Sequence, residues 1–327
     1  MVDMEKREDS GVTILSRYPS FEGANIATGI GFKHIMYLAE DGVVNYFRER
    51  GWGPQFLYER HGLGFEIVHA DVRLLNGINL DDLVRIEVKA TNLPTDLELS
   101  FSVQMFISRA GRDMKAVSGN WRVLLRQEEP ITSAGNLPSG LAGYVTEKID
   151  RCSSAPLLLP QPSVGLDDQD IASSVGRLLL QGSNSFLWKR RIPYFYCHYN
   201  TRLQHSGYVR LLEEVVSLFL ADRGISIRTM LEKKGWIPIV TKTEIEIVRE
   251  AYIEEDIYVV FTIENIFKSF TYRARVDYYV LRGTELFLTG SGVITHGYLE
   301  IKGRHDWNLA SFDEPTLAAL SGRGTTL

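Results

Sequence analysis

The chain has 327 residues, of which 44% are hydrophobic and 24% are charged. This composition is typical of soluble globular proteins, and the length is enough for two domains. The net charge of −5 lacks the basic excess of a nucleic-acid-binding surface. The apolar runs are too short to span a bilayer, and the first ten residues are charged, without a signal segment. We therefore expect a cytoplasmic protein that binds neither nucleic acid nor a membrane.

In the first half, the residues after Asp41 have the spacing of an amphipathic helix, with Val43, Val44 and Phe47 among polar neighbours. Asp41 is the predicted N-cap, because its short carboxylate can accept a backbone N–H of the first turn. Strand periodicity follows the helix. The predicted strands cover residues 65–75, 83–91, 97–107 and 114–126.

The middle of the chain, from about residue 128 to 185, is rich in Pro, Ser and Gly, which is typical of a linker. Two short helices are predicted inside it, around residues 140–150 and 170–180. The chain then divides into an N-terminal unit over 11–128, a linker over 129–185 and a C-terminal unit over 186–300. The tail from 321 to 327 is expected to be disordered.

The second half repeats this order. Tyr208, Val209, Leu212 and Phe219 recur at helical spacing, and Ser206 is the predicted N-cap. The predicted strands cover residues 239–248, 257–263, 269–281 and 286–296. Aromatic side chains are frequent on these strands; most must be core, and some could line an apolar tunnel between the helix and the sheet.

The two halves share a sequence skeleton, Leu-x-x-(Asp/Ser)-Gly-x-Val, which starts at Leu38 and again at Leu203, 165 positions later. The last strands share a Ser-Gly pair at a similar offset. Each half is then one helix with four long antiparallel strands, and such a helix is best buried by curling the sheet around it. The predicted fold is α+β, with two such units fused and paired edge to edge as a pseudo-dimer.

The stretch Tyr208-Val-Arg-Leu-Leu-Glu-Glu214 resembles the helical part of the hotdog-fold acyl thioesterase and dehydratase superfamily, of the 4-hydroxybenzoyl-CoA thioesterase kind. The strands over 236–297 agree with that family in length and order, and the first half resembles it over 43–50 and 63–125. The resemblance implies a tandem hotdog protein that acts on acyl-CoA or acyl carrier protein. Coenzyme A or phosphopantetheine would be part of the substrate, no cofactor would be needed, and the chain could pair as a homodimer.

One feature departs from the family pattern. The family's catalytic Asp lies ten positions before the helical Tyr, where this chain has His198 in the second half and Lys33 in the first. A different alignment places Gln204 and His205 on the family's Gln-His pair, and Thr201 then falls near the Asp position. Neither alignment supplies the Asp, so the family's mechanism does not carry over unchanged.

The start of each central helix is the predicted reaction site, because the positive end of a helix polarises a carbonyl oxygen. Glu40 and His205 precede the two helices at matched positions and could act as general base or acid. Gly42 and Gly207 would let a thioester approach the backbone. The alternative is structural, with Glu40 supporting a helix start and His205 an ordinary polar residue of a first turn.

Other polar residues flank the same sites. His34 or His198, with Glu40 or Asp41, could form the pair of a dehydratase; the alternative, which we favour slightly, is a histidine that caps a strand end. Asn200 could orient water or simply favour a turn. Arg202, with the basic run at 188–191, could meet the phosphates of coenzyme A, or form a solvated edge.

The two cysteines, Cys152 and Cys197, show no metal-binding spacing, so no metal site and no disulfide are expected. We expect Cys197 to be buried rather than paired with His198, since neighbours on a strand point to opposite faces. The favoured function is hydrolysis of an acyl thioester. The alternatives are a dehydratase or other acyl-modifying enzyme of polyketide or fatty-acid metabolism, and a non-catalytic acyl-thioester binder.

Overall fold

A computed structural model describes residues 11–92, 97–128, 137, 140–159, 168–180, 184–197, 199–303 and 306–322. The chain forms two compact units. Unit 1 contains His34–Ile67 and Val72–Glu147 together with the N-terminal strand, and unit 2 contains the chain from Lys148 onward. Two short pieces, Gly31–Lys33 and Val68–Asp71, also belong to unit 2.

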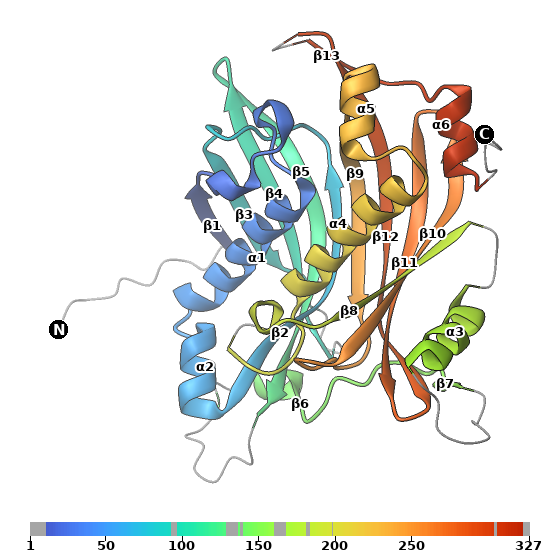
Figure 1. The fold of residues 1–327 in the computed structure, drawn as a ribbon. Coiled ribbons are helices and arrows are strands. Elements are labelled where there is room, and N and C mark those ends of the chain that lie inside the picture. Colours follow the sequence, from blue (N-terminus) through green and yellow to red (C-terminus); the bar gives the residue numbers. More distant parts are fainter. Residues whose placement is uncertain are drawn as a thin grey trace. The chain divides into compact units, whose positions relative to one another are not determined.

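Unit 1 is a central helix on an antiparallel sheet (Figure 1). The strands lie in the order β1-β3-β4-β5-β2. Gly42 allows the helix to pack closely on the sheet. A Cβ at this position would lie only 2.6 Å from Cγ2 of Ile86 on β3. The elements are β1 (Val12–Arg17), α1 (Phe32–Glu49), α2 (Pro54–His61), β2 (Leu63–Leu74), β3 (Val84–Ala90), β4 (Leu99–Arg109), β5 (Arg112–Gln127) and the short β6 (Val145–Thr146).

Unit 2 has the same plan, with strand order β9-β12-β11-β10-β8. Its central helix lies across the sheet (Figure 1). The repeated elements are β8 (Ser185–Arg191), α4 (His205–Asp222), α5 (Ile227–Lys234), β9 (Trp236–Ile247), β10 (Asp256–Phe267), β11 (Thr271–Arg282) and β12 (Glu285–Ile301). Around them lie β7 (Leu157–Leu158), α3 (Asp168–Leu179), β13 (Trp307–Leu309) and α6 (Glu314–Leu320).

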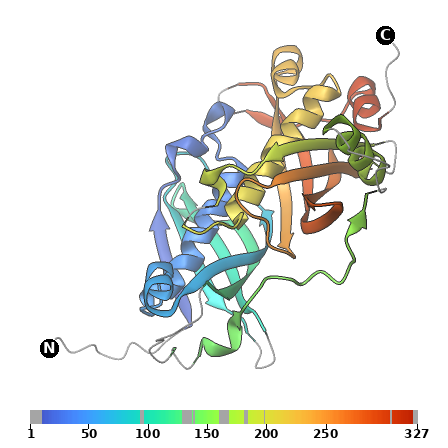
Figure 2. The ribbon, with the colours of Figure 1, turned by 60° about the horizontal axis from the view of Figure 1, so that its bottom comes forward.

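Helix α3 covers part of unit 2's sheet (Figure 2). Its Val175 is fully buried in a cluster with Tyr258 of β10 and Leu286 of β12. The predicted helix around 170–180 is therefore confirmed. Around 140–150, by contrast, only the 3-10 turn Ala142–Tyr144 is helical, and α6 was not predicted. Residues 323–327 of the predicted disordered tail lie outside the described residues. No described helix combines the length and apolarity that a membrane crossing requires.

The two units match element by element at a constant offset. Helices α1 and α4 both have 18 residues, α2 and α5 both have 8, and β2 and β9 both have 12. Phe32 and His205, the first residues of α1 and α4, are 173 positions apart, and the later pairs keep this offset. The offset of 165 inferred from the sequence is therefore wrong by about two helical turns. Helical periodicity explains the error, because residues about two turns apart lie on the same face.

Candidate functional site

The central helix of unit 2 begins at His205, with Gln204 as its N-cap. The backbone N–H groups of Gly207 and Tyr208 donate to the Gln204 carbonyl at 2.9 and 3.1 Å. The prediction that Ser206 caps this helix is wrong, since Ser206 lies inside the first turn. His205 and Ser206 are 3% and 4% exposed. The imidazole therefore lies in a buried environment at the positive end of the helix.

The chain that leads into α4 pairs with the segment that follows β9. Arg202 and Tyr252 form an antiparallel bridge, and Leu203 N–H donates to the Ala251 carbonyl at 2.8 Å. In an antiparallel pair, successive residues run opposite one another. Glu250 therefore comes to lie beside Gln204, the residue before His205.

Glu250, the residue before Ala251, is a buried carboxylate that is 3% exposed. Its Oε1 accepts the backbone N–H of Ile149 at 3.2 Å, and its Oε2 accepts the hydroxyl of Tyr252 at 2.5 Å. The Glu250 carbonyl also accepts Arg282 Nη2 at 2.9 Å. These contacts fix the orientation of the carboxylate. Glu250 is one residue from the pairing of Leu203 with Ala251 and His205 is two residues from it, so both are candidates for proton transfer at this helix start.

Sequence reasoning missed Glu250. A signal was present, since a charged pair, Arg249 and Glu250, interrupts an otherwise apolar stretch at the end of a buried strand. Arg249 is accounted for by an ion pair with Asp150 at 3.0 Å. What the sequence could not show is that this stretch lies against the residues before His205.

The other predicted residues of unit 2 have structural contacts. Asn200 Oδ1 accepts the backbone N–H of Arg202 at 2.9 Å, which is the turn-forming role. Arg202 itself is 4% exposed. His198 lies outside the described residues. Gly207 is tightly packed by other residues of the chain, because a Cβ there would lie 2.5 Å from Leu203 Cδ1. Its small size therefore lets the helix start pack, and that packing accounts for the glycine.

The acidic residues predicted for unit 1 do not lie at a helix start. Helix α1 begins at Phe32, so Glu40, Asp41 and Gly42 lie in its interior. The prediction that Asp41 is an N-cap is wrong. Asp41 instead forms an ion pair with Arg17 of β1 at 2.6 Å. Burial raises the pKa of Asp41, and the Arg17 guanidinium opposes that shift. Unit 2 repeats this contact, since Arg190 of β8 pairs with Glu214 of α4, and both pairs hold the helix on its sheet.

His34 is also a packing residue. It is 6% exposed and its ring contacts Tyr37, with 5.2 Å between centroids. A Cβ on Gly23 would lie 2.7 Å from His34 Cγ, and His34 Nε2 is 3.8 Å from Glu22. Glu40 and Asp41 lie about two turns further along α1, roughly 10 Å along the helix axis. The dehydratase pair expected from His34 with Glu40 or Asp41 is therefore not assembled within α1.

Unit 1 lacks the counterpart of the unit 2 site. Its chain has the same pairing, with a bridge between Gly29 and Asn79 and Ile30 N–H donating to the Ile78 carbonyl at 2.8 Å. At the offset of 173, however, Phe32 replaces His205, Gly77 replaces Glu250 and Gly29 replaces Arg202. The two copies therefore share the backbone arrangement, while the acid and the imidazole occur in unit 2.

The cysteines and the basic run are accounted for structurally. Cys152 and Cys197 are both free. Cys197 is buried as predicted, and burial raises the pKa of its thiol to about 11, so it is not a nucleophile at neutral pH. In the basic run, Lys189 pairs with Asp256 at 2.8 Å and Arg191 pairs with Glu254 at 3.0 Å.

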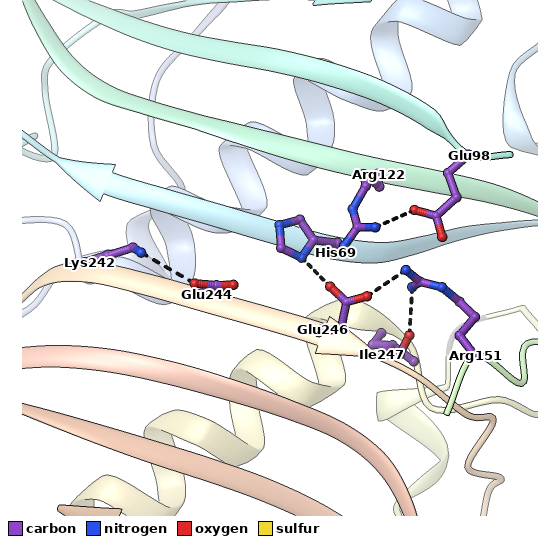
Figure 3. Close-up of polar contacts among 8 residues, drawn as sticks. All are labelled: His69, Glu98, Arg122, Arg151, Lys242, Glu244, Glu246 and Ile247. Atoms are coloured by element: carbon purple, nitrogen blue, oxygen red, sulfur yellow. Dashed lines mark hydrogen bonds and ion pairs between the residues drawn. The ribbon is translucent and has the colours of Figure 1, made fainter. Parts of the chain in front are cut away.

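A second acid–base group occurs in unit 2 at Glu246 of β9 (Figure 3). Its Oε2 is 2.6 Å from His69 Nδ1, and its Oε1 is 2.7 Å from Arg151 Nη2. Arg151 also donates to the Ile247 carbonyl at 3.1 Å. Both oxygens of this carboxylate are thus engaged by cationic or imidazole groups. The contacts tie segments together, and we do not assign this group to the chemistry.

Among the described residues, no three His, Cys, Asp or Glu side chains gather as a metal site would require.

Comparison with known proteins agrees with this fold. Residues 166–320 match the model of the thioesterase-like superfamily. The 12:0-ACP thioesterase from Umbellularia californica superposes with a TM-score of 0.57 at 9% identity, covering 88% of this chain and 97% of that one.

An acyl-ACP thioesterase from Bacteroides thetaiotaomicron superposes with a TM-score of 0.54 at 10% identity, covering 89% and 99%. No curated protein matches the chain significantly by sequence. At such identities the structures show a shared fold, and the family match extends over unit 2. The match to the thioesterase-like superfamily thus covers residues 166–320, and the chain as a whole has a fold of two hotdog units.

Proposed function

We propose that this chain hydrolyses an acyl thioester at the start of α4, with His205 and Glu250 as its proton-transfer groups. The observations that carry the proposal are a histidine buried at the positive end of the central helix and a buried carboxylate next to Ala251, which pairs with the chain that leads into this helix. The match of residues 166–320 to the thioesterase-like superfamily supports it.

The chemistry requires a water to attack the carbonyl carbon and a thiol to leave. A base takes a proton from the water as the C–O bond forms, and the carbonyl oxygen becomes an alkoxide. The positive end of α4 favours that negative charge. The alkoxide then re-forms the carbonyl, the C–S bond breaks, and the thiolate takes the proton. We assign the proton removal to Glu250; the proton then passes from Glu250 to His205, and His205 delivers it to the leaving thiolate.

The family match and the shared fold support a proposal for the substrate class. Acyl-ACP thioesterases superpose on most of this chain, so we propose an acyl group carried by an acyl carrier protein or by coenzyme A. The protein then needs no cofactor of its own, since the phosphopantetheine arm arrives with the substrate. A role in fatty-acid or polyketide metabolism follows from that substrate class.

The test is thiol release from a panel of acyl-CoA and acyl carrier protein substrates. We expect His205→Ala and Glu250→Gln each to lower kcat at least about 100-fold, the lower range for loss of a general acid or base. Glu40→Gln is the matched control, because it removes a carboxylate from the interior of α1 and should leave the rate unchanged. Circular dichroism checks that each variant is folded.

Two results would contradict the proposal. If Glu250→Gln keeps the wild-type rate while Glu40→Gln loses it, the chemistry lies at α1 and the assignment is wrong. If no substrate releases thiol although acyl-CoA raises the Tm, the chain binds thioesters without hydrolysing them.

A further inference from the structure

Three buried polar side chains gather at one end of the interior of unit 2. Tyr272 of β11 lies opposite His296 of β12, and Tyr298 follows two positions later on the same face. Tyr272 and Tyr298 are fully buried and His296 is 3% exposed. The rings touch, with centroids 5.0 Å apart for Tyr272 and His296 and 5.5 Å apart for His296 and Tyr298.

Their polar atoms have no hydrogen-bond partner within the described part of the chain. These atoms are the two phenol oxygens and Nδ1 of His296. A buried polar atom without a partner costs about 1–3 kcal/mol. A cost of this kind in a native fold calls for an explanation, such as a group that binds there.

The fold itself does not require polar residues at these positions. Unit 1 has the same strand register, with Leu99 opposite Val123 as Tyr272 is opposite His296. The third position is Leu125 in unit 1. All three unit 1 residues are buried aliphatic side chains. The polar set is therefore a property of unit 2 and not of the hotdog interior in general.

The three groups are electrically neutral. Burial lowers the pKa of His296 to about 3, and burial raises the pKa of both Tyr272 and Tyr298 above the usual value. Each phenol can donate and accept a hydrogen bond, and a neutral imidazole offers one donor and one acceptor. Bringing a charged group here would cost far more than bringing an uncharged one. The arrangement therefore suits a hydroxyl, carbonyl or amide.

The surroundings are apolar and closed. Tyr298 also contacts Trp236 and Phe312, with centroids 5.8 and 5.9 Å apart. The C-terminal segment is hydrogen-bonded to β12 at this end, since Ala310 N–H donates to the Tyr298 carbonyl at 2.9 Å. Lys234 of α5 further pairs with Asp313 at 2.6 Å. A ligand that reaches this place must be mostly apolar.

One face of β12 runs from this end toward α4. A Cβ on Gly290 would lie 3.1 Å from the ring of Tyr208, three residues after His205. Positions 290, 292, 294 and 296 share that face. His296 is six positions beyond Gly290, which corresponds to about 20 Å along the strand. This separation is within the reach of a long acyl chain.

We propose that this end of unit 2 receives the distal part of the acyl group, and that the preferred acyl group carries an uncharged hydrogen-bonding substituent there, such as a hydroxyl. The inference rests on the proposed function, because it places the carbonyl of the same substrate at His205. It goes further by naming the chemical class of the acyl group.

The test compares straight-chain acyl-CoA substrates of increasing length, each with and without a hydroxyl on the terminal carbon. At the best length we expect kcat/KM to be at least about tenfold higher for the hydroxylated chain, since a site built to bond a hydroxyl discriminates against its absence. Tyr298→Phe and Tyr272→Phe should each reduce this preference. Tyr279→Phe is the matched control, because Tyr279 packs in the α3 cluster, and it should keep the preference.

Equal rates for both series at every length, or a preference that survives in both tyrosine variants, would overturn the inference. The polar residues would then be packing residues. The same comparison can be made without turnover in His205→Ala, where the hydroxylated acyl-CoA should raise the Tm more than the plain one. A chain that hydrolyses nothing but shows this difference would contradict the proposed function and support the inference.

Discussion

At the scale of single residues, the two units solve one packing problem in opposite ways. In unit 1 a glycine, Gly23, makes room for the His34 side chain, whereas in unit 2 Gly207 makes room for Tyr196. The two pairs occupy equivalent positions at the offset of 173. A large side chain at either of the two positions fills the space between them, provided that the residue at the other position is small. His34 is thus explained by volume, and its presence near a helix start is not evidence of catalysis.

His296 gives a residue-scale prediction on pH. Its pKa is about 3 in the folded chain, whereas an unfolded histidine has a pKa of about 6.5. Between these values the unfolded state binds the additional proton, so this residue's contribution to the free energy of unfolding is lost as the pH falls from about 6.5 toward 3. We expect His296→Val to show a shallower loss of stability over that window.

Urea unfolding at pH 7 and at about pH 4.5 measures the effect. Tyr298→Phe is the control, because it alters the same cluster without removing a group that titrates in this window. An equal loss of stability in His296→Val and the wild type would show that the buried imidazole does not resist protonation.

At the scale of elements, glycines end the short second helices. Gly62 after α2 and Gly235 after α5 both have left-handed backbones, with φ of 60° and 64°. Each N–H closes the helix by bonding carbonyls of the preceding turn. Glycine adopts this conformation without the strain that a Cβ causes. The turn into β2 and into β9 is thereby set by the same local rule.

Two glycine substitutions should have opposite effects on stability. Gly235→Ala should lower the free energy of unfolding by about 1 kcal/mol, because alanine is strained at positive φ. Gly176→Ala should raise it by about 0.5–1 kcal/mol, because Gly176 lies inside α3 and a Cβ there would meet nothing within 4 Å. Chemical denaturation of both variants measures this. A stabilising Gly235→Ala would show that the left-handed turn is not required.

The strands were predictable and the central helix starts were not. Alternation of apolar and polar residues identifies a strand wherever one face is buried, and the eight long strands after the helices lie where that pattern predicts them. Helix α1 begins nine residues before Asp41, at Phe32. The stretch includes Lys33, His34 and Glu40 but no N-cap signal, so the later Asp41-Gly42 pair was mistaken for the start.

At the scale of the whole molecule, the duplication was visible in the sequence, but the pairing of distant segments in each copy was not. His205 could be proposed from the sequence because the local stretch around it resembles the family pattern. Glu250 could not, because its place beside Gln204 depends on the hydrogen bond between Leu203 and Ala251, a pairing of distant segments. Sequence periodicity predicts the length of an element and which of its faces is buried. It does not predict which loops contact each other.

The asymmetry of the two copies predicts how many substrates one chain binds. The first-copy counterparts of His205 and Glu250 are Phe32 and Gly77, so the first copy has neither of the proposed proton-transfer groups at the equivalent place. We expect a non-hydrolysable acyl-CoA thioether to bind with a stoichiometry of one per chain in isothermal titration calorimetry, once a suitable acyl group is known.

Two variants make this prediction more specific. Because the single site should lie in unit 2, Tyr298→Phe should weaken the one binding event, whereas a substitution inside α1, such as Glu40→Gln, should leave its Kd unchanged. Two thioether molecules per chain, with only one of them sensitive to Tyr298→Phe, would mean that unit 1 also binds acyl groups. The replacement of His205 and Glu250 by Phe32 and Gly77 would then have removed proton transfer from unit 1 without removing substrate binding.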